Sequence, residues 1–160
     1  MSANTKPKVE EEEFIDVDLS VTKKKKIRIN GDNSKIIELN TSDLNILERL
    51  SKQYPVLQEC MEEVKALSTK DTDTDEGVYK MAEEFARINQ KLCDGVDAIF
   101  DSPVSAVCCD GGSMYDPFNG SFRYEHIIDT LTKLYEDNIN AEYKKMKNRV
   151  ENKANKYKGK

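Results

Sequence analysis

The chain has 160 residues, which is long enough for one domain whose core needs no metal ion or disulfide to stabilise it. Its composition of 38% hydrophobic and 34% charged residues, with no tryptophan, indicates a modest core and solvated ends. The net charge of −5 argues against a general electrostatic attraction to nucleic acid or anionic membranes, and no apolar run approaches the roughly 20 residues that cross a bilayer.

The first forty residues predict an arm followed by a small sheet. Residues 1–13 offer almost nothing to bury and lack the apolar stretch of a secretory signal, so we expect a disordered arm and a cytoplasmic protein. Apolar and polar residues alternate over residues 14–21, which predicts a first strand. Two further runs, residues 25–29 and 35–39, flank the turn-forming segment 30–33 and predict a β-hairpin.

Helical spacing of apolar residues begins after Thr41, where several side-chain oxygens can cap a helix N-terminus. Pro55 either divides the first helical segment or opens a second one, whose apolar face spans residues 56–67. The clearest pattern covers residues 76–100 and predicts one long amphipathic helix. A loop containing a short helical stretch separates it from a last helix over residues 122–150.

These elements predict an α+β, mainly helical fold, with an N-terminal β-hairpin or small sheet followed by a bundle of about four helices. We expect a single domain over residues 14–151, in which residues 14–40 form the β segment and residues 42–151 are helical. The long helix is expected to pack on the last helix. Residues 152–160 are expected to form a basic, frayed tail.

No residue set in the chain predicts catalysis or a bound cofactor. The soft metal ligands are Cys93, Cys108, Cys109 and His126, and their spacing lacks the paired ligands of structural zinc sites. The cysteines are expected to be reduced thiols, and His126 is expected to lie on a helix surface rather than to act as a base. The acidic cluster that begins at Asp71 lacks the glycine position and the terminal glutamate of a calcium loop. The chain is therefore predicted to be non-enzymatic, without metal or cofactor.

Two basic segments raise the question of nucleic-acid binding. Alternate lysines of residues 23–26 would occupy the solvated face of a strand, where they also prevent unwanted edge pairing. In the basic tail, Tyr143 and Tyr157 lie too far apart for the stacking platform of single-strand binders. Nucleic-acid binding is therefore disfavoured, although it stays open as an alternative.

The long amphipathic helices favour a protein that holds other protein chains. Methionine and aromatic side chains on a helix face can receive a partner helix and adapt to several partners. The same stripes equally suit a hydrophobic core. The candidate contact residues on the long and last helices are Phe85, Ile88, Leu92, Ile99, Phe100, Ile128, Leu131 and Tyr135.

The second half of the chain resembles a known family in the order of its motifs. An amphipathic helix ends in an aspartate, an aliphatic residue and phenylalanine at residues 97–100, and a small-residue turn follows at residues 101–103. A short apolar helix at residues 104–108, a glycine-containing break at residues 110–112 and a basic final helix over residues 127–157 complete the pattern. This order, after a short N-terminal β segment, is similar to the small tail assembly chaperones of long-tailed bacteriophages.

The resemblance implies a protein that covers the hydrophobic helices of the tape measure protein, prevents their aggregation and delivers them to tail tube subunits. It implies action in the bacterial host cytoplasm, without a cofactor. Two alternatives remain open: a structural virion protein that uses its strands for sheet addition between subunits, and a small nucleic-acid-binding regulator. A homo-oligomer is compatible with each of them.

Overall fold

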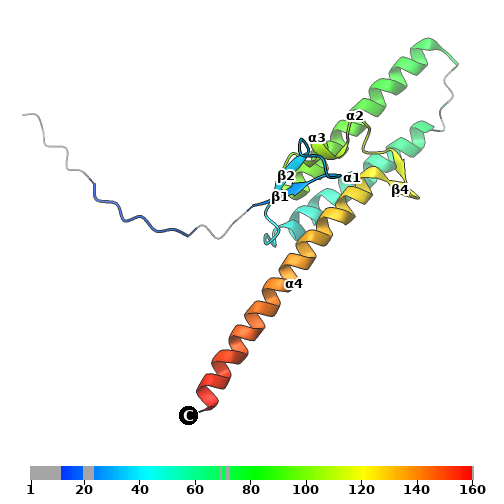
Figure 1. Cartoon of the computed structure of the whole chain (residues 1–160). Coiled ribbons are helices and arrows are strands. Elements are labelled where there is room, and N and C mark those ends of the chain that lie inside the picture. The colour runs from blue at the N-terminus through cyan, green and yellow to red at the C-terminus, as the bar shows by residue number, and fades with distance from the viewer. Residues whose placement is uncertain (1–11, 20–23, 69, 71–72, 160) are drawn as a thin grey trace, which may run out of the picture.

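The structure, a computed structural model, describes residues 12–19, 24–68, 70 and 73–159. Within these residues, an N-terminal two-stranded antiparallel sheet precedes four helices, and a small β-hairpin with two residues in each strand precedes the last of them (Figure 1). This arrangement confirms the predicted α+β, mainly helical class. One continuous cluster of buried apolar side chains joins the sheet to all four helices.

The N-terminal sheet consists of β1 (Lys25–Arg28) and β2 (Ile36–Leu39). The turn between them contains Asn30 and Gly31 at φ values of 53° and 69°, a left-handed conformation that these residue types tolerate. Ile37 and Leu39 are buried, whereas Ile36 and Glu38, which alternate with them along the strand, are exposed. The predicted hairpin is confirmed, with one face of β2 in the core.

The predicted first strand is wrong for residues 14–19, while residues 20 and 21 lie outside the described residues. Residues 12–19 form an extended chain without strand pairing, and all of them are exposed. The apolar side chains of this stretch are at least 75% exposed. Alternation of apolar and polar residues indicates which side of a strand can be buried, but it does not supply a partner strand. Of the predicted arm, residues 1–11 also lie outside the described residues.

The first helix, α1 (Ile46–Ser68), continues through Pro55, where the sequence predicts a division. Proline cannot donate the helical hydrogen bond to the carbonyl of Ser51. Both residues are exposed, so water can satisfy that carbonyl and the helix continues. The opposite face is buried, and its residues are Leu57, Cys60, Met61, Val64 and Leu67.

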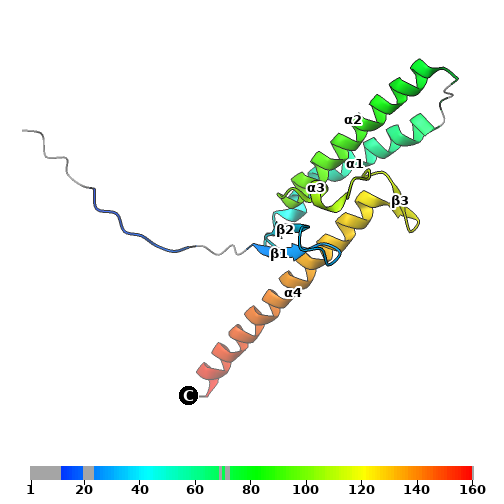
Figure 2. The ribbon, with the colours of Figure 1, turned by 45° about the horizontal axis from the view of Figure 1, so that its top comes forward.

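The second helix, α2 (Asp75–Phe100), lies along α1 (Figures 1 and 2). The Thr74 hydroxyl caps its start by accepting a hydrogen bond from the backbone N–H of Gly77 at 3.1 Å. Gly95 allows the two helices to approach closely, because a Cβ atom there would lie 2.9 Å from Cδ2 of Leu57. The expected packing of α2 on the last helix is present, with the ring centroids of Phe100 and Tyr135 6.0 Å apart, but α2 packs more extensively on α1.

A short helix, α3 (Val104–Cys108), and a small hairpin of β3 (Pro117–Phe118) and β4 (Ser121–Phe122) lead to α4 (Arg123–Lys158). The start of α4 packs into the core through five buried side chains: Tyr124, Ile127, Ile128, Leu131 and Tyr135. Its second half projects from the body of the molecule (Figures 1 and 2). The helix continues through residues 152–158, where the sequence predicts a frayed tail.

Candidate protein-binding surface

The structure places most of the predicted contact residues in the core. Seven of the eight are buried, namely Ile88, Leu92, Ile99, Phe100, Ile128, Leu131 and Tyr135. Phe85 is partly buried and lies against Tyr115, with the ring centroids 5.3 Å apart. A partner can reach the seven buried side chains only if the fold opens. Their part in this structure is to hold α2 and α4 in the domain.

The projecting half of α4 carries a different set of apolar side chains, which nothing in the described chain covers. Tyr143, Met146, Val150 and Tyr157 are 53%, 56%, 65% and 77% exposed. Starting from Ile139, they follow at intervals of four, three, four and seven residues, which keeps them on one face of the helix. We call these four exposed residues the α4 stripe.

The α4 stripe lies in a strongly basic segment of an acidic protein. Residues 143–159 contain seven basic residues and one acidic residue, whereas the whole chain has a net charge of −5. Lys147 and Arg149 lie close to Met146 and Val150 along the helix and are exposed. An apolar surface with positive flanks is thus presented to solvent.

At its end nearest the body, the α4 stripe opens into a hollow. This hollow has a volume of about 470 Å³ and is lined in part by Leu44, Tyr143 and Met146. Leu44 is itself 50% exposed, so the turn before α1 extends the apolar surface beyond α4. Here Asn138 connects α4 to that turn, because its amide donates to the hydroxyl of Ser42 at 2.8 Å.

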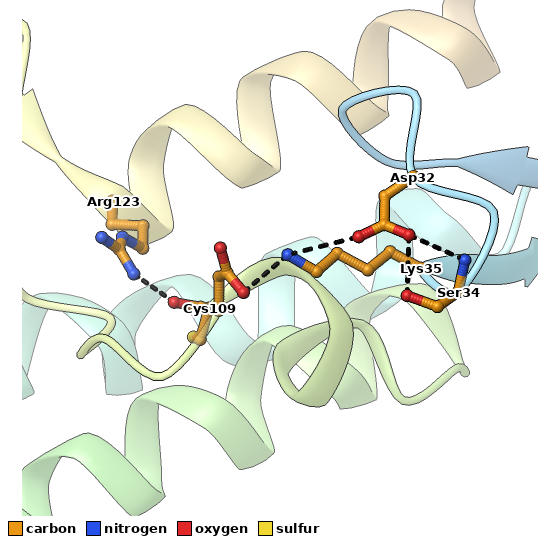
Figure 3. A network of polar contacts seen from close by, with 6 residues as sticks. Asp32, Ser34, Lys35, Cys109 and Arg123 are labelled. Carbon is orange, nitrogen blue, oxygen red and sulfur yellow. Dashed lines mark hydrogen bonds and ion pairs between the residues drawn. The ribbon is translucent and has the colours of Figure 1, made fainter.

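A set of polar contacts fixes the start of α4 to the rest of the domain. The guanidinium of Arg123 donates to the backbone carbonyl of Cys109 and lies 3.6 Å from the carboxylate of Asp116. One residue further on from Cys109, Asp110 accepts a hydrogen bond from Lys35 of the first hairpin at 2.6 Å (Figure 3). The base of the projecting helix is therefore held by the loop after α3, which is itself tied to the first hairpin.

The cysteines and His126, which were considered for metal binding or nucleophilic chemistry, pack against neighbouring side chains. Cys93 is partly buried and Cys109 is buried, while His126 packs against Phe118 with ring centroids 4.5 Å apart. Burial raises the pKa of both Cys108 and Cys109 to about 11, which disfavours the reactive thiolate. Across the described residues, no group of three or more potential ligands is arranged to hold a metal ion.

The predicted contact residues did not include the α4 stripe, although the sequence contains a signal for it. The apolar spacing of the last helix continues into a segment with seven basic residues in seventeen. A helix with so many charges cannot be buried on all sides, so its apolar side chains stay exposed and can contact a partner.

No known protein family, curated protein or solved structure matches this chain. None of the helices in the described parts of the chain has both the length and the apolar character needed to cross a membrane.

Proposed function

We propose that this protein is a non-enzymatic tail assembly chaperone that binds helices of a tape measure protein and helps to recruit tail tube subunits. The observation that supports this proposal best is the α4 stripe on a helix that projects from the body. A long helical client exposes apolar stripes of its own, which a second amphipathic helix can cover side by side.

The composition of the α4 stripe suits a contact that forms and is later replaced. Two tyrosines, a methionine and a valine offer large, adaptable apolar surfaces without a deep pocket. Burying one such side chain contributes roughly 1.5–3 kcal/mol before the costs of association are subtracted. A few such contacts hold a client helix reversibly, so tube subunits can displace the chaperone.

The basic flanks indicate which client helices bind best. Residues 143–159 repel a second copy of the same segment, because both would carry seven basic residues and one acidic residue. A client helix with acidic residues beside its apolar stripe is attracted instead. Raising the ionic strength should weaken this preference more than it weakens the apolar contact.

The test is co-expression with the candidate tape measure protein, followed by size-exclusion chromatography of the soluble fraction. The informative variant is Met146→Lys/Val150→Lys, which places two charges in the α4 stripe. The matched control is Asn148→Lys/Asn152→Lys, which adds the same charge on another face of α4. All four side chains are exposed, so both variants should fold and unfold like the parent chain.

The expected result is that the parent and the control keep the tape measure protein soluble and co-elute with it, whereas the Met146→Lys/Val150→Lys variant does not. A tape measure protein that stays insoluble with the parent chain would contradict the proposal. So would a stripe variant that works as well as the control.

A second candidate, a nucleic-acid-binding regulator, is favoured by one observation. A shallow hollow of about 480 Å³ on α4 is lined by basic side chains that include Lys145, Arg149 and Lys153. Such a surface binds phosphates with an affinity that falls steeply as salt rises. The same variants distinguish the two candidates, because Asn148 and Asn152 line this hollow and Met146 and Val150 do not. Lysines at Asn148 and Asn152 should strengthen phosphate binding and leave helix binding unchanged, whereas lysines at Met146 and Val150 should weaken helix binding.

A further inference from the structure

A stretch of apolar side chains near the N-terminus is uncovered in this structure. Residues 12–19 run as an extended chain away from the body, and each of them is exposed (Figure 1). Because side chains alternate along an extended chain, Ile15, Val17 and Leu19 share one side and Asp16 and Asp18 share the other. The segment therefore has one aliphatic face, and its other face carries the two aspartates together with Phe14.

The outer edge of β1 has the complementary pattern. Within the described residues the sheet has two strands, so β1 pairs with β2 along one side only. Ile27 is partly buried on the same face as its partner Ile37, while Lys26 and Arg28 are exposed on the other face. The outer edge of β1 thus presents Ile27 on its core side, next to Lys25, whose amine donates to Asn138 of α4 at 2.6 Å, and is basic on its other side.

Two hollows lie between this edge and α4, beside which β1 runs (Figure 2). Each has a volume of about 510 Å³, and Ile27 and Leu134 line both. Phe118 lines one of them and, like Leu134, is a large apolar side chain that remains exposed. Side chains of a strand added at the outer edge of β1 would enter these hollows.

We propose that residues 14–19 of a second copy of this chain add as a third strand to the outer edge of β1. Main-chain hydrogen bonds would join the two strands, as in other cases of strand addition. The three aliphatic side chains would cover Ile27 and Leu134, and the two aspartates would lie beside Lys26 and Arg28. Opposite charges across neighbouring strands and buried aliphatic pairs both stabilise such a sheet.

The connecting residues favour exchange between copies over a hairpin within one chain. Residues 20–23 read Ser-Val-Thr-Lys and include no glycine, asparagine, aspartate or proline. A tight hairpin turn needs residues that tolerate positive φ, which β-branched valine and threonine do poorly. Valine and threonine are common in extended chains rather than in such turns.

The test measures self-association of the full-length chain by sedimentation over a range of protein concentrations. The informative variant is Ile15→Lys/Val17→Lys. The matched control is Glu12→Lys, which changes the net charge by the same two units in the same exposed segment but keeps the aliphatic face. Hydrogen exchange of the backbone amides of residues 14–19 gives a second readout, because strand pairing protects amides.

The expected result is a parent chain and a Glu12→Lys control that associate above the 18.3 kDa monomer, with residues 14–19 protected. The Ile15→Lys/Val17→Lys variant should dissociate at concentrations at least about tenfold higher. A parent chain that is monomeric throughout, or association that the double variant leaves unchanged, overturns the proposal. A monomer with protected amides in residues 14–19 overturns it as well and indicates a hairpin within one chain.

Discussion

Asp97, near the C-terminal end of α2, holds the start of α3, and its removal should destabilise the whole domain. Its carboxylate accepts hydrogen bonds from the backbone N–H and the hydroxyl of Ser105, at 2.7 and 2.8 Å. Ser105 is buried, so Asp97→Ala leaves two donors without their partner and away from water. A hydrogen bond to a charged group contributes about 1.5–3 kcal/mol, and these two share one carboxylate. We therefore expect the free energy of unfolding to fall by roughly 3 kcal/mol.

The assay is urea denaturation of the variant followed by its helical circular dichroism. The control is Asp94→Ala, one turn earlier on α2, where an exposed carboxylate accepts a hydrogen bond from Gln90 at 2.8 Å. The control should lower the free energy of unfolding by less than about 0.5 kcal/mol. Asp97→Asn keeps one acceptor for Ser105 and should give an intermediate value. If the two alanine variants differ by less than about 0.5 kcal/mol, the carboxylate does not hold α3 and this reasoning fails.

Two further predictions concern Arg49 and the buried thiols. Arg49 donates to the carbonyl of Ile99 at 2.6 Å and lies 2.9 Å from Asp43, so Arg49→Met should lower the free energy of unfolding in urea by about 1–2 kcal/mol at neutral pH. Although partial burial opposes it, the hydrogen bond from Arg49 holds the pKa of Asp43 below its usual 3.8. The contribution of the Arg49–Asp43 pair is therefore present above about pH 4 and lost as the pH falls through the lowered pKa of Asp43. The difference in free energy of unfolding between variant and parent should narrow there to the part due to the bond to Ile99, and a difference that does not change with pH would contradict this. Burial raises the pKa of Cys108 and Cys109 to about 11. Their labelling by a thiol reagent near pH 8 should therefore be slow in the native protein and fast in urea. Rapid labelling of the native protein would show that these thiols are not protected by burial.

Local sequence chemistry was sufficient to predict the first hairpin and the long helices. Asn30 and Gly31 adopt the positive φ values for which their residue types are suited, and that turn sets the register of β1 against β2. The same reasoning failed at residues 14–19. Their alternation is as regular as that of β2, but a strand also needs a neighbouring strand to pair with, and the local pattern does not identify one.

The partner of α2 illustrates a second limit. Each long helix has an apolar face, and periodicity does not reveal which faces meet. The chain length between helices does carry this information, because a short connection makes successive helices antiparallel neighbours. The connection between Ser68 and Asp75 is short, and α2 indeed lies along α1. Connection length was therefore the better guide to packing than similarity of the apolar faces.

Periodicity also cannot separate a core face from a binding face. Ile128 and Met146 both belong to the apolar face of α4, but the first is buried and the second is 56% exposed. What differs is their surroundings: α2 and the small hairpin of β3 and β4 contact the start of α4, and no described element reaches its end. The predicted contact residues were chosen for their spacing alone, and most of them belong to the core.

The length of α4 connects the fold to the proposed binding surface. An isolated helix of about seventeen residues is marginally stable in water, because its first turn is costly to form. In this chain the buried residues at the start of α4 form that first turn, and the helix can extend from it to Lys158. The basic residues beside the α4 stripe keep the projecting half solvated and disfavour its pairing with a second copy. The domain core and the basic segment together thus preserve an ordered, uncovered helix face, and a partner that binds it does not have to order that helix first.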